Sequence, residues 1–319
     1  MTANTGKVRM EEVDALFARQ LEAWDVAKNN YAALANVKVK ELVVGNAHFK
    51  IQFNPARIVS SAAKVDAKSI KERKCFLCKS NRPAVQEGID WGGRYEILVN
   101  PFPIFPRHLT IPCKEHTPQR ISDRIGDMMA IAHDLNGYIL FYNGPKCGAS
   151  APDHMHFQAG NKGFMTFDKD IEVAGLENVV TVDKACLSVV KGLSRMAFLI
   201  KASDIDAGEE LFKRLYDVLP LATDDDAEPM LNILCWQDNE AEAWNIAVFP
   251  RVKHRPSCYF KEGDANMLIT PASVDMGGVF ITPLEKDFVK ITSDDVAMIL
   301  DEVCMTQETA YEIVKKLNK

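Results

Sequence analysis

The sequence predicts an α+β protein of two similar halves, each a mostly antiparallel sheet with helices packed on it. Short apolar runs typical of strands alternate with runs at helical spacing, and the second half repeats the kinds of element found in the first. The length of 319 residues suits one large domain or two ordinary ones. We therefore expect an N-terminal helix in residues 1–35, a first half in residues 36–170 and a second half in residues 171–319.

The first half begins with apolar residues at helical spacing, which predict an amphipathic helix over residues 10–34. Residues 38–60 alternate as strands do, and the polar, basic residues 60–74 predict a loop. The remaining predicted elements are strands at 95–99 and 109–113, a helix at 119–137, a strand at 138–142, a Gly/Pro/Ser-rich loop at 143–153 and a strand at 154–158.

The second half is predicted in the same way. Strands are expected at residues 179–181 and 197–200, and a helix at 207–219. Two apolar runs, 231–236 and 244–250, predict an antiparallel hairpin around a turn at 237–242. Ser293, followed by two aspartates, is a candidate N-cap for a long C-terminal helix.

The composition is that of an ordinary globular protein, with 47% hydrophobic and 26% charged residues. A net charge of −6 gives no global attraction to nucleic acid or to an anionic membrane. We see neither a signal-peptide pattern nor an apolar run of transmembrane length, and we expect a cytoplasmic protein. The eight cysteines are then thiols or metal ligands rather than a disulfide framework.

A C-x-x-C motif at Cys75 and Cys78 has the spacing with which two thiolates bind one ion, and sulfur suits zinc. The chain has no second C-x-x-C, so the other ligands must differ in type. His116 and His154 are the candidates, with His108 a weaker one. The alternatives are two unremarkable cytosolic thiols or a redox pair, although no βαβ pattern brackets the motif.

The stretch Asp153-His-Met-His-Phe-Gln158 is the most informative one. Residues two apart on a strand face the same way, so His154, His156 and Gln158 share one face, with Met155 and Phe157 turned into the core. A neutral imidazole can attack an α-phosphorus and form a phosphoramidate. This requires the other ring nitrogen to donate to a backbone carbonyl. The alternative is a metal-binding pair or surface histidines.

Three stretches together resemble the galactose-1-phosphate uridylyltransferase branch of the histidine-triad superfamily. They are CFLCKSNRPAVQEGIDWGGRYEILVNPFPIFPRH, LTIPCKEHTPQRI and FYNGPKCGASAPDHMHFQ. The segments FKIQFNPARIVSS and LNILCW…AWNIAVFPR are similar to stretches of the related nucleotide-sugar and dinucleoside-polyphosphate phosphorylases. Two positions depart from the family pattern: Pro101 replaces the aspartate of Asn-Asp-Phe, and Met155 replaces the proline between the histidines.

The resemblance implies two histidine-triad-like halves and a set of site residues. His156 is then the covalent nucleophile, with Gln158 and Ser150 at the phosphate. The implied ligands of a structural zinc are Cys75, Cys78, His116 and His154, and the implied nucleoside contacts are Asn100, Phe102 and Leu77. Arg57 and Arg251 are placed near phosphates, with a solvated surface arginine as the alternative for each.

The implied activity is that of a nucleotidyltransferase of EC class 2.7.7 in carbohydrate metabolism. It would carry a nucleotide on His156 from a nucleotide sugar to a sugar phosphate or to inorganic phosphate, with ping-pong kinetics. The alternatives are a histidine-triad hydrolase and a non-catalytic, zinc-containing nucleotide-binding protein. Hydrolases of this type carry a third histidine where Gln158 stands, and glutamine cannot act as a general acid. Members of the family form dimers, so the resemblance is compatible with a homodimer of this chain.

Overall fold

A ten-stranded sheet forms the centre of the protein in this computed structural model, which describes residues 7–58, 66–238 and 242–318. The strand order is β3-β4-β5-β7-β6-β11-β12-β10-β9-β8, and every neighbouring pair is antiparallel. Its strands are β3 (Gly88–Trp91), β4 (Tyr95–Val99), β5 (His108–Pro112), β6 (Tyr138–Asn143), β7 (His156–Asn161), β8 (Gly175–Val182), β9 (Ala185–Lys191), β10 (Phe198–Ala202), β11 (Leu231–Asp238) and β12 (Ala243–Pro250).

This sheet consists of two halves with the same topology. Read from its two outer edges inward, the order is β3-β4-β5-β7-β6 on one side and β8-β9-β10-β12-β11 on the other. Each half inserts one helix between its third and fourth strands in the chain: α5 (Ile125–Asp134) and α7 (Ile205–Val218). The halves join where β6 pairs with β11, with Asn143 opposite Asn232. The predicted α+β class with two mostly antiparallel halves is thus confirmed.

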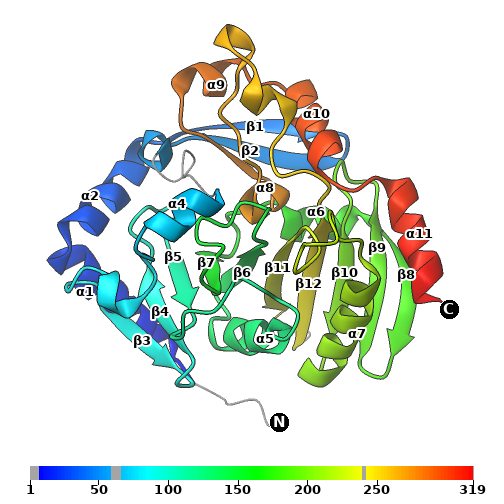
Figure 1. Ribbon diagram of the computed structural model, residues 1–319, viewed down its shortest axis with the longest axis horizontal. Helices are drawn as coiled ribbons and strands as arrows, with labels where there is room; N and C mark the ends of the chain where they lie inside the picture. Colours follow the sequence, from blue (N-terminus) through cyan, green and yellow to red (C-terminus); the bar gives the residue numbers. More distant parts are fainter. Residues whose placement is uncertain (1–6, 59–65, 239–241, 319) are drawn as a thin grey trace.

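A smaller sheet lies beside one face of the large one (Figure 1). It consists of β1 (Lys38–Val44), β2 (Ala47–Phe53) and β13 (Val279–Thr282), and β13 runs parallel to β2. The first two strands of the chain therefore do not join the sheet of the first half. They pair with a strand more than 200 residues away, since Ile51 lies opposite Phe280.

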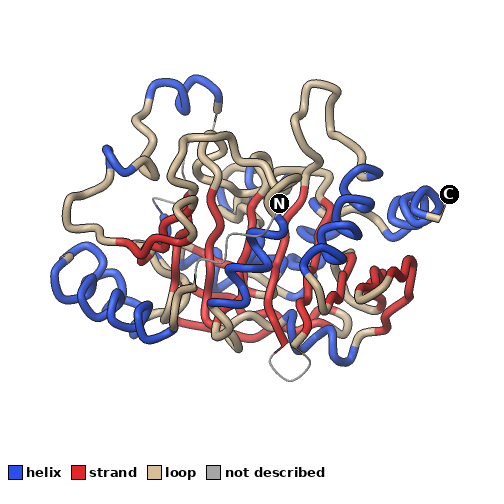
Figure 2. The backbone as a smooth tube through the Cα atoms, turned by 90° about the horizontal axis from the view of Figure 1, so that it is seen from below, coloured by secondary structure: helices blue, strands red, loops and turns tan. Residues whose placement is uncertain are grey.

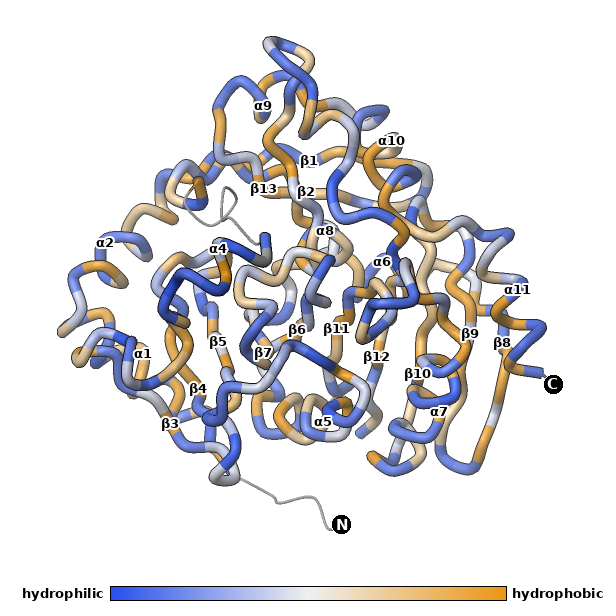
Figure 3. The backbone as a smooth tube through the Cα atoms, viewed as in Figure 1, coloured by the Kyte–Doolittle hydropathy of each residue, from blue (hydrophilic) through white to orange (hydrophobic). Residues whose placement is uncertain are grey.

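Two hydrophobic cores cover the two faces of the large sheet. One core packs the sheet against α5, α7, α1 (Met10–Ala23) and α11 (Gln307–Leu317). The other packs it against the small sheet, α6 (Phe167–Val173), α8 (Ser273–Met276) and α10 (Ser293–Val303). The strands form a layer with helices outside it (Figure 2). Hydrophobic residues concentrate along the strands (Figure 3). None of the helices within the described ranges combines the length and hydropathy needed to cross a bilayer.

Several predicted boundaries were wrong. The N-terminal helix divides at Trp24, whose backbone is extended, into α1 and α2 (Asp25–Ala33). The helix expected at 119–137 begins only at Ile125. The predicted C-terminal helix follows Thr292, whose side chain caps it in place of Ser293, and it breaks at Cys304 because the following Met305 donates its N–H to Pro250 of β12.

The polar stretch 60–74 lies only partly in the described ranges, because residues 59–65 are outside them. Its described part contains a short helix, α4 (Ala67–Glu72), where a loop was predicted. The remaining helix, α9 (Glu285–Lys290), packs on β2 and β13. The hairpin of β11 and β12 is confirmed, and residues 239–241 of its predicted turn also lie outside the described ranges.

Candidate active site and metal centre

The candidate site lies where β7 begins, on the face of the large sheet that the small sheet covers. Met155 and Phe157 point into the opposite core, as predicted, and are 1% and 0% exposed. His156 and Gln158 face the other way from β7, while His154 lies just before this strand. The buried Met155 and Phe157 thus fix which face of the strand carries the polar side chains.

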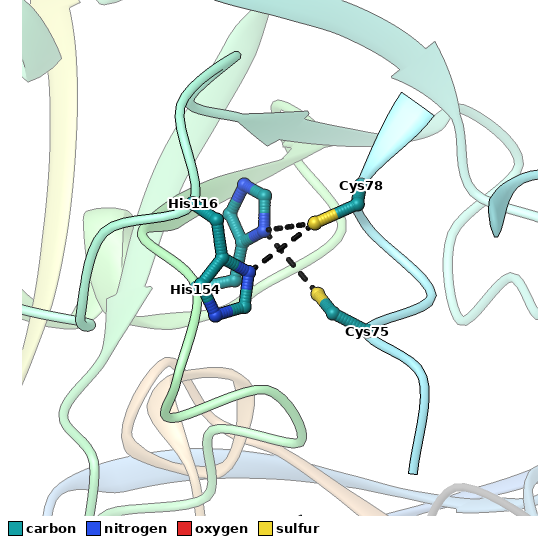
Figure 4. Close-up of side chains that lie close together, drawn as sticks. All are labelled: Cys75, Cys78, His116 and His154. Atoms are coloured by element: carbon teal, nitrogen blue, oxygen red, sulfur yellow. Dashed lines mark hydrogen bonds between the residues drawn. The ribbon is translucent and has the colours of Figure 1, made fainter. Parts of the chain in front are cut away.

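Cys75, Cys78, His116 and His154 form one cluster (Figure 4), in which the four ligand atoms all lie within 4.8 Å of one another. The Cys75 sulfur is 3.3 Å from Nδ1 of His154, and the Cys78 sulfur is 3.2 Å from Nδ1 of His116 and 3.6 Å from Nδ1 of His154. In a tetrahedral zinc site a sulfur and a nitrogen ligand lie about 3.5 Å apart. The donor atoms and their spacing therefore fit such an ion.

The surroundings of the cluster orient its ligands. Nε2 of His154 lies 2.7 Å from the carbonyl oxygen of Cys113, which leaves Nδ1 toward the sulfurs. Burial by itself raises the pKa of Cys75, but the protonated form of the neighbouring His154 ring and the N–H groups of Leu77 and Cys78 lower it to about 6. The turn between the cysteines is held by Asn81, whose side-chain amide donates to the Cys75 carbonyl at 2.9 Å.

The ring of His156 is held in one tautomer by the backbone. Its Nδ1 lies 2.8 Å from the carbonyl oxygen of His154, which can only accept a hydrogen bond. Nδ1 therefore carries the ring hydrogen, and Nε2 keeps a free lone pair. The side chain is 3% exposed, and burial lowers the pKa of His156 to about 4. The ring is thus neutral near pH 7, with Nε2 able to act as a nucleophile.

Gln119 is a residue of this site that the sequence did not reveal, because residue 119 was assigned to a helix. It is fully buried, and its Oε1 accepts from the N–H of His156 at 2.8 Å. Its Nε2 donates to the carbonyls of Asn143 and His156, each at 3.0 Å. The side chain thus bridges the end of β6 and the start of β7, where the two strands diverge. No local pattern in the sequence signals such a bridge.

A second group of polar residues surrounds Gln158. His108, 0% exposed on β5, lies with Nε2 at 3.0 Å from the Gln158 Oε1. Asn100 donates from its side-chain amide to Thr110 at 2.8 Å and to Gln158 at 3.5 Å. Arg57 donates to the carbonyl of Phe102 at 2.7 Å, and its charge contributes to lowering the pKa of His108. His108 is outside the Cys/His cluster, so its weaker candidacy as a metal ligand was wrong.

Two further predicted contacts, Leu77 and Ser150, lie near the cysteines and in the loop before β7. Leu77 is 7% exposed and packs with Cys75 and Ala151 in a small apolar cluster. Ser150 is half-buried in the loop, and its carbonyl accepts from Arg73 at 3.0 Å. Arg73 also pairs with Asp153 at 2.9 Å, which ties the segment before Cys75 to the segment before His154.

Arg251 is not the solvated surface arginine considered as an alternative, because it is 4% exposed. Its guanidinium donates to Asn232 at 2.6 Å and to the carbonyls of Val303, Pro271, Lys253 and His254. Protein oxygens thus occupy all three of its nitrogens, which leaves none for a direct phosphate contact. Asn232 in turn donates to the Cys147 carbonyl at 2.8 Å, so Arg251 supports the loop before β7.

Three comparisons relate this chain to known proteins. Residues 16–161, fewer than half of the chain, match the family described as a domain of unknown function, DUF4922. Diadenosine 5',5'''-P1,P4-tetraphosphate phosphorylase 2 of Saccharomyces cerevisiae is 31% identical over 116 residues. That match covers 31% of this chain and 35% of the yeast protein, so it spans about a third of the relative's length.

The solved structures extend the likeness to most of the chain. Yeast Ap4A phosphorylase Apa2 in complex with AMP superposes with a TM-score of 0.56 at 18% identity, over 88% of this chain and 95% of that one. The same protein in complex with Ap4A gives a TM-score of 0.55 at 18% identity, over 89% and 97%. The chain therefore shares the fold of yeast Ap4A phosphorylase.

Proposed function

We propose that this protein is a nucleotidyltransferase that carries a nucleoside monophosphate on His156. One observation supports this most directly. The bond from Nδ1 of His156 to the His154 carbonyl leaves Nε2 unprotonated, on the strand face that also carries Gln158. A neutral, oriented imidazole next to a non-titrating donor suits attack on phosphorus. The partial likeness to a yeast phosphorylase agrees with this chemistry.

The reaction has two balanced steps. Nε2 of His156 attacks the α-phosphorus, a nitrogen–phosphorus bond forms, and the bond from phosphorus to the bridging oxygen breaks. The leaving phosphate departs with that electron pair. In the second step an oxygen of the acceptor attacks the same phosphorus and releases the imidazole. Gln158 donates to a non-bridging oxygen in both steps, and the loop around Ser150 offers N–H groups to the phosphates.

Zinc is proposed as a structural ion held by Cys75, Cys78, His116 and His154. The four ligand atoms already lie at distances that suit a tetrahedral site. When bound, the ion supplies a rigid link between the Cys75–Cys78 turn and the segment that leads into His156. The residues themselves position the nucleophile, since the His154 carbonyl is its hydrogen-bond partner.

The substrate is proposed to contain a nucleotide phosphoanhydride, as in a nucleoside diphosphate sugar or a dinucleoside polyphosphate. The base would lie near Leu77 and the ribose and phosphates near Asn100, Phe102 and Arg57. Arg57 supports this placement, because it reaches Phe102 and its charge acts on His108, the neighbour of Gln158. Inorganic phosphate is the proposed acceptor, with a sugar phosphate as the alternative.

Hydrolysis is the second candidate, and the chemistry of Gln158 disfavours it. A glutamine cannot protonate a leaving group, and an amine leaving group needs that proton more than a phosphate does. A phosphate leaving group therefore suits this site. A non-catalytic nucleotide-binding protein is the third candidate, and a correctly oriented His156 nucleophile would have no role there.

The test is the intact mass of the protein after incubation with Ap4A, UDP-glucose, ADP-glucose and a GDP-hexose, with and without inorganic phosphate. We expect one nucleoside monophosphate to be added and then lost on addition of phosphate or a sugar phosphate. His156→Ala should form no adduct, whereas His133→Ala, on α5 outside the site, should form it normally. Release of free monophosphate without an adduct supports hydrolysis, and no turnover of any substrate contradicts catalysis.

A further inference from the structure

His108 is a buried histidine to which the proposed reaction assigns no step. The N–H of Ile104 donates to its Nδ1 at 3.2 Å. A backbone N–H can only donate, so Nδ1 must be the unprotonated nitrogen of a neutral ring. The ring hydrogen is then on Nε2, which lies 3.0 Å from Oε1 of Gln158 and donates to it.

The ring cannot easily leave this arrangement. It is 0% exposed and packs edge-on against Phe105, with ring centroids 5.2 Å apart, and at 5.9 Å from Phe141. Burial, helped by the charge of Arg57, lowers the pKa of His108 to about 3. The ring therefore stays neutral across the physiological range, and the hydrogen on Nε2 remains in place.

Asn100 also donates a hydrogen bond to Oε1 of Gln158, independently of His108. The N–H of Phe102 donates to its Oδ1 at 2.9 Å, which turns its Nδ2 toward Thr110 and toward Oε1 of Gln158. Two backbone N–H groups of the segment after β4 thus set the direction of both hydrogen-bond chains. Both chains end on the same oxygen of Gln158.

The consequence concerns the other end of the Gln158 amide. Because Oε1 accepts the hydrogen bonds from His108 and Asn100, the Nε2 group of Gln158 must point away from both residues. Within the described part of the chain, no side chain or carbonyl accepts a hydrogen bond from it. Gln158 lies two residues after His156 on the same strand face, about 6.6 Å along β7. A phosphate attached to the His156 ring would lie within reach of that donor.

We propose that His108 is a positioning residue that holds the amide of Gln158 with its N–H groups toward the reacting phosphate. This rests on the proposed function, since Gln158 is the residue that touches the substrate. Without this restraint, the Gln158 amide could rotate and present its oxygen to the phosphate, and the two negatively polarised groups would repel each other. One hydrogen bond of about 1 kcal/mol biases the two orientations roughly fivefold. His108 and Asn100 together bias them more strongly.

The first test does not depend on activity. In protein labelled with ¹⁵N-histidine, we expect the nitrogen shifts of His108 to show the neutral Nε2–H tautomer at every pH from about 5 to 8. His108→Phe assigns the signal. A neutral Nδ1–H tautomer, or a ring that becomes charged in this range, would overturn the proposal even if the enzyme is active. An absence of nucleotidyl transfer would instead count against the proposed function.

The second test compares variants by the single-turnover rate of adduct formation. His108→Gln keeps a donor toward Gln158, and His108→Asn keeps an acceptor for Ile104 but loses that donor. We expect His108→Asn to slow the step about 3- to 10-fold and His108→Gln to slow it less. The isosteric Gln158→Glu, which must present an oxygen to the phosphate, should slow it at least about 100-fold.

A double-variant comparison separates positioning from general damage to the fold. In a Gln158→Ala background, His108→Asn should cause no further loss of rate, because the amide that it orients is absent. Equal losses in both backgrounds would mean that His108 acts only on the fold and would refute the proposal. So would a Gln158→Glu protein that keeps the wild-type rate.

Discussion

Replacing Gln119 with methionine tests whether one side chain holds the start of β7 in place. Methionine has nearly the same length and volume, so the change removes three hydrogen bonds and leaves little cavity. It leaves the N–H of His156 and the carbonyls of His156 and Asn143 without this partner in a buried site. Each of these three groups costs about 1–3 kcal/mol, so we expect a loss of roughly 3–9 kcal/mol. That is a large share of a typical stability of about 5–15 kcal/mol.

The assay is urea unfolding at neutral pH, followed by tryptophan fluorescence and by circular dichroism. The matched control is Gln86→Met, because Gln86 is only half-buried and makes one long hydrogen bond of 3.4 Å to the Val99 carbonyl. We expect this control to lose less than about 1 kcal/mol. Equal losses for the two variants, or a loss below about 1 kcal/mol for Gln119→Met, would refute the reasoning.

Two further predictions concern the metal cluster and a buried carboxyl group. Wild-type protein should contain one zinc ion per chain, and Cys75→Ser should contain almost none and unfold at a lower denaturant concentration. The control is Cys186→Ser, outside the cluster, which should keep its zinc. Equal zinc contents in the two variants would contradict the assigned ligands. Burial raises the pKa of Glu228 to about 7, although Tyr142 and the Ile121 N–H donate to it. Folded Glu228 therefore binds its proton more tightly than unfolded Glu228. This proton stabilises the fold below pH 4.5, and the free energy of unfolding falls by on the order of 3 kcal/mol as the pH rises to about 7. Glu228→Gln should remove this loss, so the difference in unfolding free energy between wild type and variant should change sharply from pH 5 to pH 8; a difference that stays constant would show that the carboxyl does not titrate there.

The candidate site could be predicted in part because its chemistry is concentrated in short motifs. Alternation around His156 predicted which side chains face the core, since Met155 and Phe157 are apolar and the residues that alternate with them are polar. The pairing of β5 with β7 brings together the segments that carry His116 and His154, and the Cys75–Cys78 turn lies against them, so residue types that had already indicated metal binding form one cluster. In such cases the sequence carries the pattern within a few positions.

The missed features depend on contacts between distant segments. Gln119 lies in a segment whose apolar residues fit a helix, yet its amide bonds to strands that the pattern cannot place. Arg251 resembles any arginine after a strand, and only the folded chain surrounds it with carbonyl groups. Likewise, the pairing of β2 with β13 joins residues more than 200 positions apart, which periodicity does not encode.

Through the pairing of β6 with β11, the second half supports the inner edge of the first half's sheet. The strand equivalent to β7 is β12, which follows β11 after only residues 239–242, whereas residues 144–155 separate β6 from β7. The second half thus has no long loop at the equivalent position, and its Asn232 and Ser273 instead hold Asn143 beside the candidate site. A fragment ending near residue 170 would leave β6 as a bare sheet edge, prone to pair with other chains. The first half therefore depends on the second to complete its sheet.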